Sequence, residues 1–535
     1  MSENETMIKS HNVPTRRVLA LSTTGGFTHA APVLDICRVL ADRGHAVEFA
    51  THDGQQTWIQ NPNYAFISKV HLLGPGPTAE QYDNHWARMV RLRVEDALSS
   101  WLMWKSKYLW DSFWPATYRQ LKRLCCDPET RPDFIIADFF DETVARDMNL
   151  ECGVPIAIVW PQMPYLLAPA PYIPGQPGFQ IDCGRLLNFW RGCGGSRSCG
   201  VERAPVIPSC PAATVPIILC SSTHFSASKP PRTYRLSWSP WGLCLAEQYP
   251  PLDERHARFL ETHHDVVYVG LGTHVVLPES SLHKLLQGLL LALDGGRIDG
   301  IIWPMNQKTR ETLDLSHVVS RAGGKVSTLG QLLDGTMSDL MVVDFAPQGA
   351  ILDHSHTRLY VTRAGGSSAN EAAYHGVPVL VLGFMFDQLA NGMRLEEAGC
   401  GHRLDKNSFT ADEVVERVSS MASSGTGALT RNVERLRRIA TVAARRKGLA
   451  ADLVEEVLYD AELRGPSRPM HLQTADMRMP WWKVHNLDLG VFALATLVGL
   501  PAVAIYSVQS LVRGRVPFTP LWRAVFALRQ LLATR

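Results

Sequence analysis

The chain alternates short apolar segments with stretches of helical periodicity. An apolar segment at 17–22 precedes a turn rich in Gly and Thr, a helix follows from around Pro32, and a second apolar segment lies at 47–50. Strands that are apolar throughout are typical of parallel sheets with helices on both faces. The pattern therefore predicts an α/β, doubly wound fold. The helix has its apolar face, with i, i+3, i+4, i+7 spacing, at Val33, Ile36, Cys37 and Leu40.

The same alternation returns in the second half of the chain. A length of 535 residues is enough for two domains and an additional segment. The Pro-rich stretch Tyr249–Asp253 separates the two halves as a linker would. We therefore expect one domain at 1–248, a second at 249–465 and a tail at 466–535. The strands expected in the second domain lie at 266–269, 298–303, 340–345, 359–362 and 379–382, with helices through 411–460.

One segment, from Phe345 to Gln388, has the residue types of a ligand-binding strand–turn–helix unit. An apolar strand at 359–362 precedes small residues at Gly365–Ser368, and the helix they open ends at Gly376. A helix that begins on small residues offers free N–H groups and the positive end of its dipole to a phosphate. In open α/β sheets, ligands bind at the carboxyl ends of the strands. The segment therefore predicts a phosphate site in the second domain.

This segment resembles the donor-binding signature of family 1 UDP-dependent glycosyltransferases, which have the GT-B fold. The match runs in register through P-Q-x-x-I-L-x-H, a Gly-Gly turn, E-A-x-Y-H-G-V-P and D-Q. The resemblance implies two Rossmann-like domains that face each other across a cleft. It also implies that a nucleotide sugar binds to the second domain. UDP is the expected nucleotide, and GDP and dTDP sugars are the alternatives.

The resemblance also implies a role for each matching donor-binding residue. Asp387 and Gln388 would bind hydroxyls of the donor sugar, and Glu371 would bind those of the ribose. Ser368 and the amides that begin at Gly365 would hold a phosphate. Gln348 and Phe345 would contact the nucleobase, and Thr273 would contact the diphosphate.

Two positions depart from the family's pattern. Phe345 stands where many relatives have a Trp that stacks on uracil, and Arg363 stands where the family has a diphosphate-binding His. An Arg is always charged and can donate two hydrogen bonds to a diphosphate. We therefore expect Arg363 to assist the departure of the leaving group.

The first domain contains a candidate catalytic pair. His29 follows the first strand, where the family has its catalytic His, and the resemblance implies that it removes the acceptor's proton. Imidazole suits this role because its pKa lies near ambient pH. An orienting carboxylate is expected from Asp138, which ends the strand at 131–138, and Asp141 is the rival. Either carboxylate could instead cap a helix.

The resemblance implies a hexosyltransferase that inverts the anomeric centre without a metal and needs no cofactor beyond its nucleotide-sugar co-substrate. The absence of any Asp-x-Asp also argues against a metal-dependent enzyme, and cysteines without Cys-x-x-Cys spacing argue against zinc. The Trp-rich segment 85–123 is either core packing or the wall of a site for an apolar acceptor, such as a secondary metabolite, sterol or lipid. The alternatives are a non-catalytic GT-B membrane subunit and a nucleotide-sugar epimerase or hydrolase.

Charge and hydropathy suggest where the protein works. A net charge of +2 implies no nucleic-acid partner. Residues 489–512 carry no formal charge over 24 positions, which is long enough to cross a bilayer as a hydrophobic helix, although a monotopic anchor or a buried helix remains open. The polar N-terminus predicts that the body of the protein is cytosolic, with reduced thiols. Together with the apolar tail, it predicts a membrane-associated enzyme at the endoplasmic reticulum or another endomembrane. Residues 183–215 read as an irregular loop without an assigned role.

Overall fold

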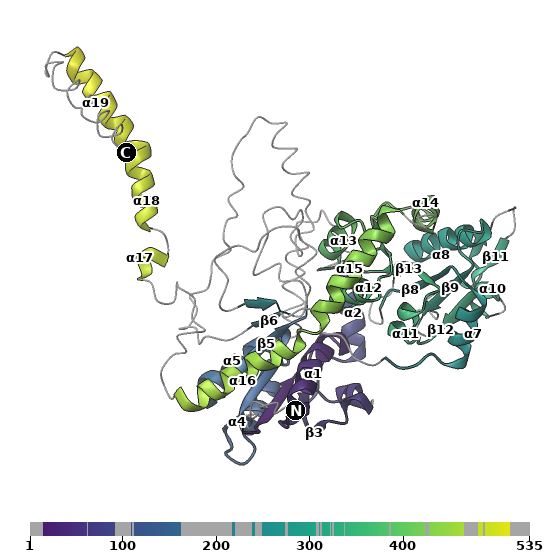
Figure 1. Cartoon of the computed structure of the whole chain (residues 1–535), viewed down its shortest axis with the longest axis horizontal. Helices are drawn as coiled ribbons and strands as arrows, with labels where there is room; N and C mark the ends of the chain where they lie inside the picture. The colour runs from purple at the N-terminus through teal and green to yellow at the C-terminus, as the bar shows by residue number, and fades with distance from the viewer. Residues whose placement is uncertain are drawn as a thin grey trace, which may run out of the picture. The chain divides into compact units, whose positions relative to one another are not determined.

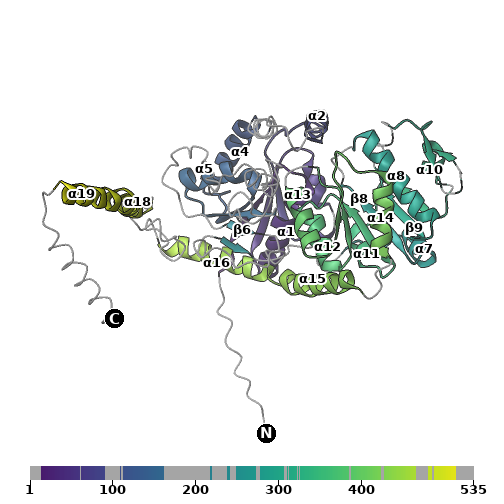
Figure 2. The ribbon, with the colours of Figure 1, turned by 90° about the horizontal axis from the view of Figure 1, so that it is seen from above.

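The computed structural model forms two compact units, Met1–Pro469 and Met470–Arg535, which are described separately. The first unit contains two parallel sheets flanked by helices (Figures 1 and 2). The residues that the structure describes are 14–60, 62–90, 109, 112–161, 217–219, 238–240, 249–272, 277–305, 310, 313–321, 323, 326–335, 337–384, 387–422, 427–464, 480–484 and 487–513.

The N-terminal sheet has seven parallel strands in the order β3-β2-β1-β4-β5-β6-β7. Every residue of β4 and β5 is buried, as expected for central strands covered on both faces. The strands are β1 (Arg17–Leu21), β2 (Ala46–Thr51), β3 (Ile67–Leu72), β4 (Phe134–Asp138), β5 (Ile156–Trp160), β6 (Ile217–Leu219) and β7 (Trp238–Pro240). The helices include α1 (Phe27–Asp42), α2 (Ala79–Val90), α4 (Trp114–Cys126) and α5 (Glu142–Cys152).

The C-terminal sheet has six parallel strands in the order β12-β9-β8-β13-β14-β15. They are β8 (Val266–Gly270), β9 (Gly300–Pro304), β12 (Leu340–Val343), β13 (Thr357–Thr362), β14 (Val379–Val381) and β15 (Gly401–Arg403). A separate antiparallel pair joins β10 (Val318–Ser320) to β11 (Val326–Thr328). The surrounding helices are α7 (Glu254–Thr262), α8 (Glu279–Asp294), α10 (Leu329–Leu333), α11 (Gln348–Asp353), α12 (Gly366–His375), α13 (Asp387–Glu397), α14 (Ala411–Ala422) and α15 (Ala428–Ala444).

Helix α1 begins five residues earlier than the sequence pattern predicts. It starts at Phe27, and Pro32 lies inside it rather than at its first turn. The helix is opened by the Gly26 carbonyl, which accepts hydrogen bonds from the amides of His29 and Ala30. His29 therefore lies in the first turn of a helix, and its main chain is fixed by that helix.

Helix α16 (Lys447–Arg464) returns to the N-terminal domain, although its sequence pattern predicts only that it completes the second domain. Figures 1 and 2 both show it alongside α1. The Arg43 guanidinium binds Glu455 and donates to Asp452 at 2.6 Å. Arg16 donates to Glu462 at 2.5 Å. Because these contacts are tertiary, the sequence of α16 does not show which domain the helix covers.

The second unit contains short helices, and the expected single hydrophobic helix is interrupted. Helix α17 is Trp481–Val484, and α18 (Leu487–Leu494) and α19 (Leu500–Val512) are separated by a π-helical turn at Ala495–Gly499. None of the helices in the part of the chain that the structure describes is long and apolar enough to cross a membrane. A span needs about 20 continuous apolar helical residues, so the predicted membrane crossing at 489–512 is not supported.

Two further expectations concern the cysteines and the residues outside the described ranges. Cys126 and Cys152 form a disulfide between the ends of α4 and α5, so the expectation of reduced thiols throughout is wrong for this pair. Thr273, the loop at 183–215 and most of the Trp-rich segment lie outside the described residues.

Candidate active site

His29 lies where the turn after β1 passes into α1, and this turn needs a glycine. Gly25 has φ of 83°, in the left-handed region that favours glycine. A Cβ at this position would lie 2.4 Å from Cδ2 of His29. The imidazole therefore lies directly against the Gly25 backbone, with only 8% of the residue exposed.

Asp138 holds the imidazole from the end of the neighbouring strand β4. Its Oδ1 lies 3.0 Å from Nδ1 of His29, and its Oδ2 accepts the Phe140 amide at 2.9 Å. The Phe140 ring lies against the other side of the imidazole, with centroids 4.7 Å apart. Asp138 thus caps the short helical turn at Phe139–Asp141 and contacts His29 at the same time, so the two sequence interpretations coexist.

Asp141, the rival carboxylate, is bound to a different group. Its Oδ2 accepts the Thr23 amide at 2.9 Å, and its Oδ1 accepts the Thr23 hydroxyl. Burial, together with the charge of Asp138, raises the pKa of Asp141 to about 7. Asp141 therefore connects the turn after β1 to the turn after β4, and Asp138 is the carboxylate hydrogen-bonded to His29.

The charges around His29 favour its protonated form. Burial lowers the pKa of His29, but the charge and hydrogen bond of Asp138, with smaller contributions from Asp387 and Asp141, outweigh it, so the pKa is raised. The contribution from Asp387 shows that this C-terminal-domain carboxylate lies within electrostatic range of the imidazole. An imidazole that has taken a proton is stabilised at this position.

The turn from β13 into α12 presents a cation and backbone amides. Ala364 has φ of 57°, and the N-cap residue Gly365 makes no side-chain hydrogen bond to the first turn of α12, whose Gly366 amide donates to Asp387. Burial lowers the pKa of Arg363 to about 10, so its guanidinium stays protonated at neutral pH. This guanidinium lies over Gly272, where a Cβ would come within 2.0 Å of it. Among the residues that the structure describes, none forms a hydrogen bond or ion pair with Arg363.

The predicted nucleoside-binding residues lie around the start of α11 and the second turn of α12. Gln348 donates to the Glu371 carboxylate and accepts from the Tyr268 hydroxyl at 3.3 Å, so its side chain points to the expected ribose carboxylate. Burial raises the pKa of Glu371 to about 7. Phe345 is 72% exposed, which leaves its ring face open to a flat group. Ser368 is the third residue of α12.

The predicted sugar-binding residues Asp387 and Gln388 begin α13. Burial raises the pKa of Asp387 to about 6, against the opposing effects of Asn391, His29 and the Gly366 amide. Gln388 accepts the Phe384 amide through its Oε1 at 3.0 Å. The Gly366 contact places Asp387 next to the N-terminus of α12, so the sugar and phosphate positions are contiguous.

Two residues of this region were missed by the sequence analysis. Asn391 donates from one amide nitrogen to Asp387 at 3.0 Å and to the Ala364 carbonyl at 2.8 Å, which joins the sugar and phosphate turns. Its position four residues after Asp387, on the same helix face, could have indicated it. The other is Lys406, whose amine is buried against the Phe384 carbonyl. No sequence pattern indicates that contact, because it joins different loops.

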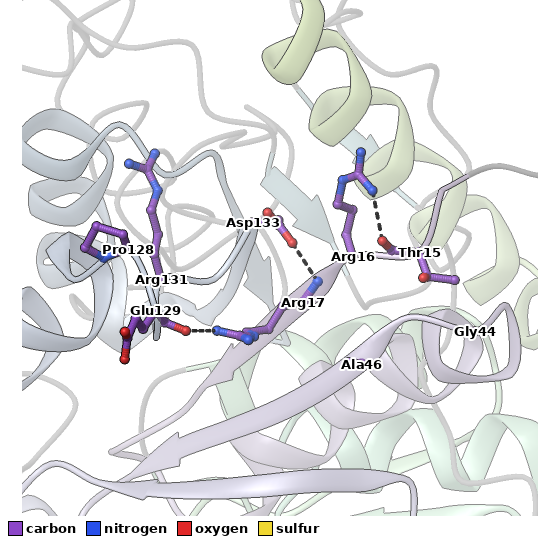
Figure 3. A pocket seen from close by; sticks show the side chains of 9 residues that line it. All are labelled: Thr15, Arg16, Arg17, Gly44, Ala46, Pro128, Glu129, Arg131 and Asp133. Carbon is purple, nitrogen blue, oxygen red and sulfur yellow. Dashed lines mark hydrogen bonds between the residues drawn. The ribbon is translucent and has the colours of Figure 1, made fainter.

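A polar cavity of about 430 Å³ lies at the end of the N-terminal sheet opposite to His29 (Figure 3). It is formed at the amino ends of β1, β2 and β4, whereas His29 and Asp138 follow the carboxyl ends of β1 and β4. Within it, Asp133 accepts the Arg17 amide at 2.8 Å, and the Arg17 guanidinium donates to the Glu129 carbonyl at 2.9 Å. The cavity is therefore separate from the candidate site.

Solved structures with the same arrangement are glycosyltransferases of the GT-B fold. The glycotransferase of kitacinnamycin superimposes with a TM-score of 0.55 at 18% identity, over 83% of this chain and 100% of that one. The structure of LpCGTa in complex with UDP gives a TM-score of 0.54 at 17% identity, over 83% and 99%. The predicted GT-B architecture is confirmed.

Sequence comparisons define the family. Residues 242–516 match the family model described as UDP-glucoronosyl and UDP-glucosyl transferase. A UDP-glycosyltransferase of Talaromyces amestolkiae is 37% identical over 94% of this chain and 98% of its own. UDP-glycosyltransferase FPY2 of Fusarium mangiferae is 34% identical over 90% and 96%. The chain belongs to the UDP-glycosyltransferase family and is an enzyme that uses a UDP-sugar donor. The non-catalytic and epimerase or hydrolase alternatives are not favoured.

Proposed function

We propose that the protein transfers a hexose from a UDP-sugar to a hydroxyl of an apolar small molecule, with inversion at the anomeric carbon and with His29 as the base. The observation that carries this proposal is the 3.0 Å contact between Nδ1 of His29 and Asp138, within electrostatic range of Asp387. Because Asp138 takes Nδ1, Nε2 is the imidazole atom left to meet an acceptor hydroxyl.

In the proposed reaction, Nε2 of His29 removes the hydroxyl proton as the acceptor oxygen bonds to the anomeric carbon. The bond between that carbon and the diphosphate oxygen breaks, and the electron pair leaves with UDP. Attack on the face opposite the leaving group inverts the centre. Asp138 stabilises the imidazolium that forms, since it already raises the pKa of His29 against the effect of burial.

The departing diphosphate would be stabilised by charges that this chain supplies. Arg363 remains a cation when buried, and the first turn of α12, which contains Ser368, begins three residues after it in the chain. Placed donors and cations stabilise developing negative charge in a transition state. We therefore propose that no metal ion or further cofactor takes part. Thr273, which lies outside the described residues, stays a prediction for the same role.

The donor's other parts would follow the order of residues along the C-terminal domain. The exposed ring of Phe345 would stack on the base, and Glu371, held by Gln348, would accept the ribose hydroxyls. Asp387 would accept hydrogen bonds from hydroxyls of the hexose, and Gln388 would donate hydrogen bonds to them.

The acceptor is proposed to be apolar because of aromatic residues on α2. Burial, with the nearby charge of Asp141, raises the pKa of Tyr82 to about 12, so this side chain lies within electrostatic range of Asp141. Trp86, one turn further along α2, packs against the core of the C-terminal domain. Aromatic walls with few polar groups bind flat or lipophilic molecules.

The test is transfer by purified protein from UDP-glucose to a panel of phenols and sterols, with UDP affinity measured separately. His29→Ala should reduce kcat by at least about 10³-fold, because a positioned base and its orienting pair are lost, with UDP affinity within twofold of wild type. NMR of the product should show the inverted anomer. Transfer by the His29→Ala variant at the wild-type rate, or retention of configuration, would refute the mechanism.

Membrane association is a second, separate proposal: the tail lies on a lipid surface without crossing it. In the second unit, Leu489, Val491, Phe492 and Leu497 are between 62% and 76% exposed. Apolar helices of this kind insert into the interface of a bilayer. The full chain should float with phosphatidylcholine vesicles, and Phe492→Glu with Leu497→Glu should abolish flotation. The control is Leu463→Glu, at a position 86% exposed in the first unit. Equal flotation of all variants would refute the proposal that the tail lies on a lipid surface.

The compartment is the remaining part of that proposal: an endoplasmic reticulum or other endomembrane, with the catalytic body in the cytosol. The Cys126–Cys152 disulfide weighs against a cytosolic body, because disulfides persist in oxidising compartments. Protease digestion of intact microsomes tests it. A body that is digested without detergent supports the proposal, and a protected body overturns it.

A further inference from the structure

Lys406 lies in the loop between β15 and α14, and its amine is buried. The residue is only 9% exposed, and Nζ donates to the carbonyl oxygen of Phe384 at 2.7 Å. Burial lowers the pKa of Lys406 to about 8, because the opposing effect of the neighbouring Asp405 charge is smaller than that of burial. Burying an ammonium group is unfavourable unless it is compensated, so a position needed only for packing would be better filled by an apolar side chain.

Phe384 is the last described residue before the proposed sugar-binding pair. Its amide donates to Oε1 of Gln388 at 3.0 Å, and its carbonyl accepts from Lys406. Its ring is buried in the same core cluster as Leu404 and Phe409, which lie on either side of Lys406. The main chain of Phe384 is therefore held through its amide by Gln388 and through its carbonyl by Lys406.

The other side of Asp387 is held by different contacts. Asn391 ties this carboxylate to the Ala364 carbonyl in the phosphate turn. Asp387 is thus tied through Asn391 to the phosphate turn, and the adjacent Gln388 is hydrogen-bonded to the residue that Lys406 holds. The nucleoside-binding candidates Gln348 and Glu371 form their own contacts on α11 and α12, away from Phe384.

We propose that Lys406 is a positioning residue that sets the affinity for the hexose of the donor, and not for its nucleotide, by holding the main chain of Phe384, to which Gln388 is hydrogen-bonded. This inference rests on the proposed role of Asp387 and Gln388. It assigns to Lys406 an indirect role, since the amine reaches a main-chain carbonyl and not the sugar.

The test compares the binding of UDP with the binding and use of UDP-sugar in the full chain. Lys406→Met should raise the KM for UDP-sugar roughly tenfold, the effect of losing one hydrogen bond from a charged donor. Its Kd for UDP should stay within twofold of wild type, which also shows that the protein is folded. Lys406→Arg keeps a cation and hydrogen-bond donors, so the rise in its log KM for UDP-sugar should be at most half of that for Lys406→Met. Lys69→Met on the exposed strand β3 is the control and should change neither constant.

Two results would overturn the proposal. Equal weakening of UDP and UDP-sugar by Lys406→Met would show a general structural role, and no weakening of either would show no role. Asp387→Ala serves as the comparator. If Asp387→Ala lowers the sugar-dependent affinity and Lys406→Met does not, only the inference about Lys406 fails. If Asp387→Ala also leaves that affinity unchanged, the proposed sugar-binding role of Asp387 and Gln388 is refuted, and the inference about Lys406 is refuted with it.

Discussion

Replacing Gly25 by Ala should displace the catalytic imidazole while leaving the donor site intact. The added Cβ would lie 2.4 Å from Cδ2 and 2.5 Å from Cγ of His29. Unstrained carbon contacts are about 3.5–4.0 Å, so the ring must move by roughly 1 Å. Starting from 3.0 Å, a movement of this size takes Nδ1 out of hydrogen-bond reach of Asp138.

The expected size of the effect follows from the lost contact. A hydrogen bond to a charged group contributes about 1.5–3 kcal/mol, so kcat should fall roughly 10- to 100-fold. The left-handed backbone adds a strain of about 1–2 kcal/mol that lowers stability. Gly296→Ala is the matched control, because Gly296 has φ of 64° and open space around its Cβ position. It carries the strain without the collision.

The assay is the initial rate of transfer from UDP-glucose at saturating acceptor, with Kd for UDP from calorimetry and Tm for each variant. Both variants should keep their UDP affinity. Gly25→Ala should lose more stability than Gly296→Ala, because it adds the collision to the backbone strain, and only Gly25→Ala should lose kcat. If the two variants have the same kcat, the position of His29 does not control the chemistry and the proposed base is wrong.

Four further outcomes are expected. Gly272→Ala should displace Arg363 and raise the KM for UDP-sugar roughly tenfold through weaker diphosphate binding, and an unchanged KM would remove Arg363 from the diphosphate site. Because burial raises the pKa of Asp387 to about 6, the KM for UDP-sugar should rise as pH falls from 7.5 to 5, and Asp387→Asn should flatten this profile; a profile that survives the substitution belongs to another group. The same raised pKa means that Asp387 stabilises the fold fully below pH 3.8 and that this contribution is lost as pH rises through 6. Arg43→Ala, which removes contacts with α16, should lower the free energy of unfolding by about 1 kcal/mol in low salt, and a loss that persists in 0.5 M NaCl would show that packing, not charge, holds the helix.

The sheets could be predicted from the sequence because buried parallel strands have a local signature. Segments such as 134–138 and 359–362 are apolar at nearly every position, and the helices between them have a clear period. The start of α1 could not be placed correctly, since Pro32 suggested a first turn and the Gly26 carbonyl opens the helix earlier.

The candidate site could be predicted wherever one motif contains it. Glu371, Asp387 and Arg363 fall in one continuous segment whose pattern is long enough to assign each position. Lys406 acts through a contact with the Phe384 carbonyl, which no pattern of side-chain types records, whereas the spacing of Asn391 from Asp387 could have indicated its contact with that carboxylate. The π-helical turn in the apolar tail at Ala495–Gly499 was missed for a similar reason, because hydropathy measures composition and not the hydrogen-bond register of the helix.

The return of α16 to α1 makes the first domain discontinuous along the chain. During synthesis, residues 14–161 emerge first, but the helix that covers α1 emerges only after the whole second domain. A fragment that ends at residue 248 would leave the α1 surface bare and Arg43 without its acidic partners. The first domain can be completed only after translation has passed residue 464, so the two halves of the enzyme cannot be obtained by cutting the chain once.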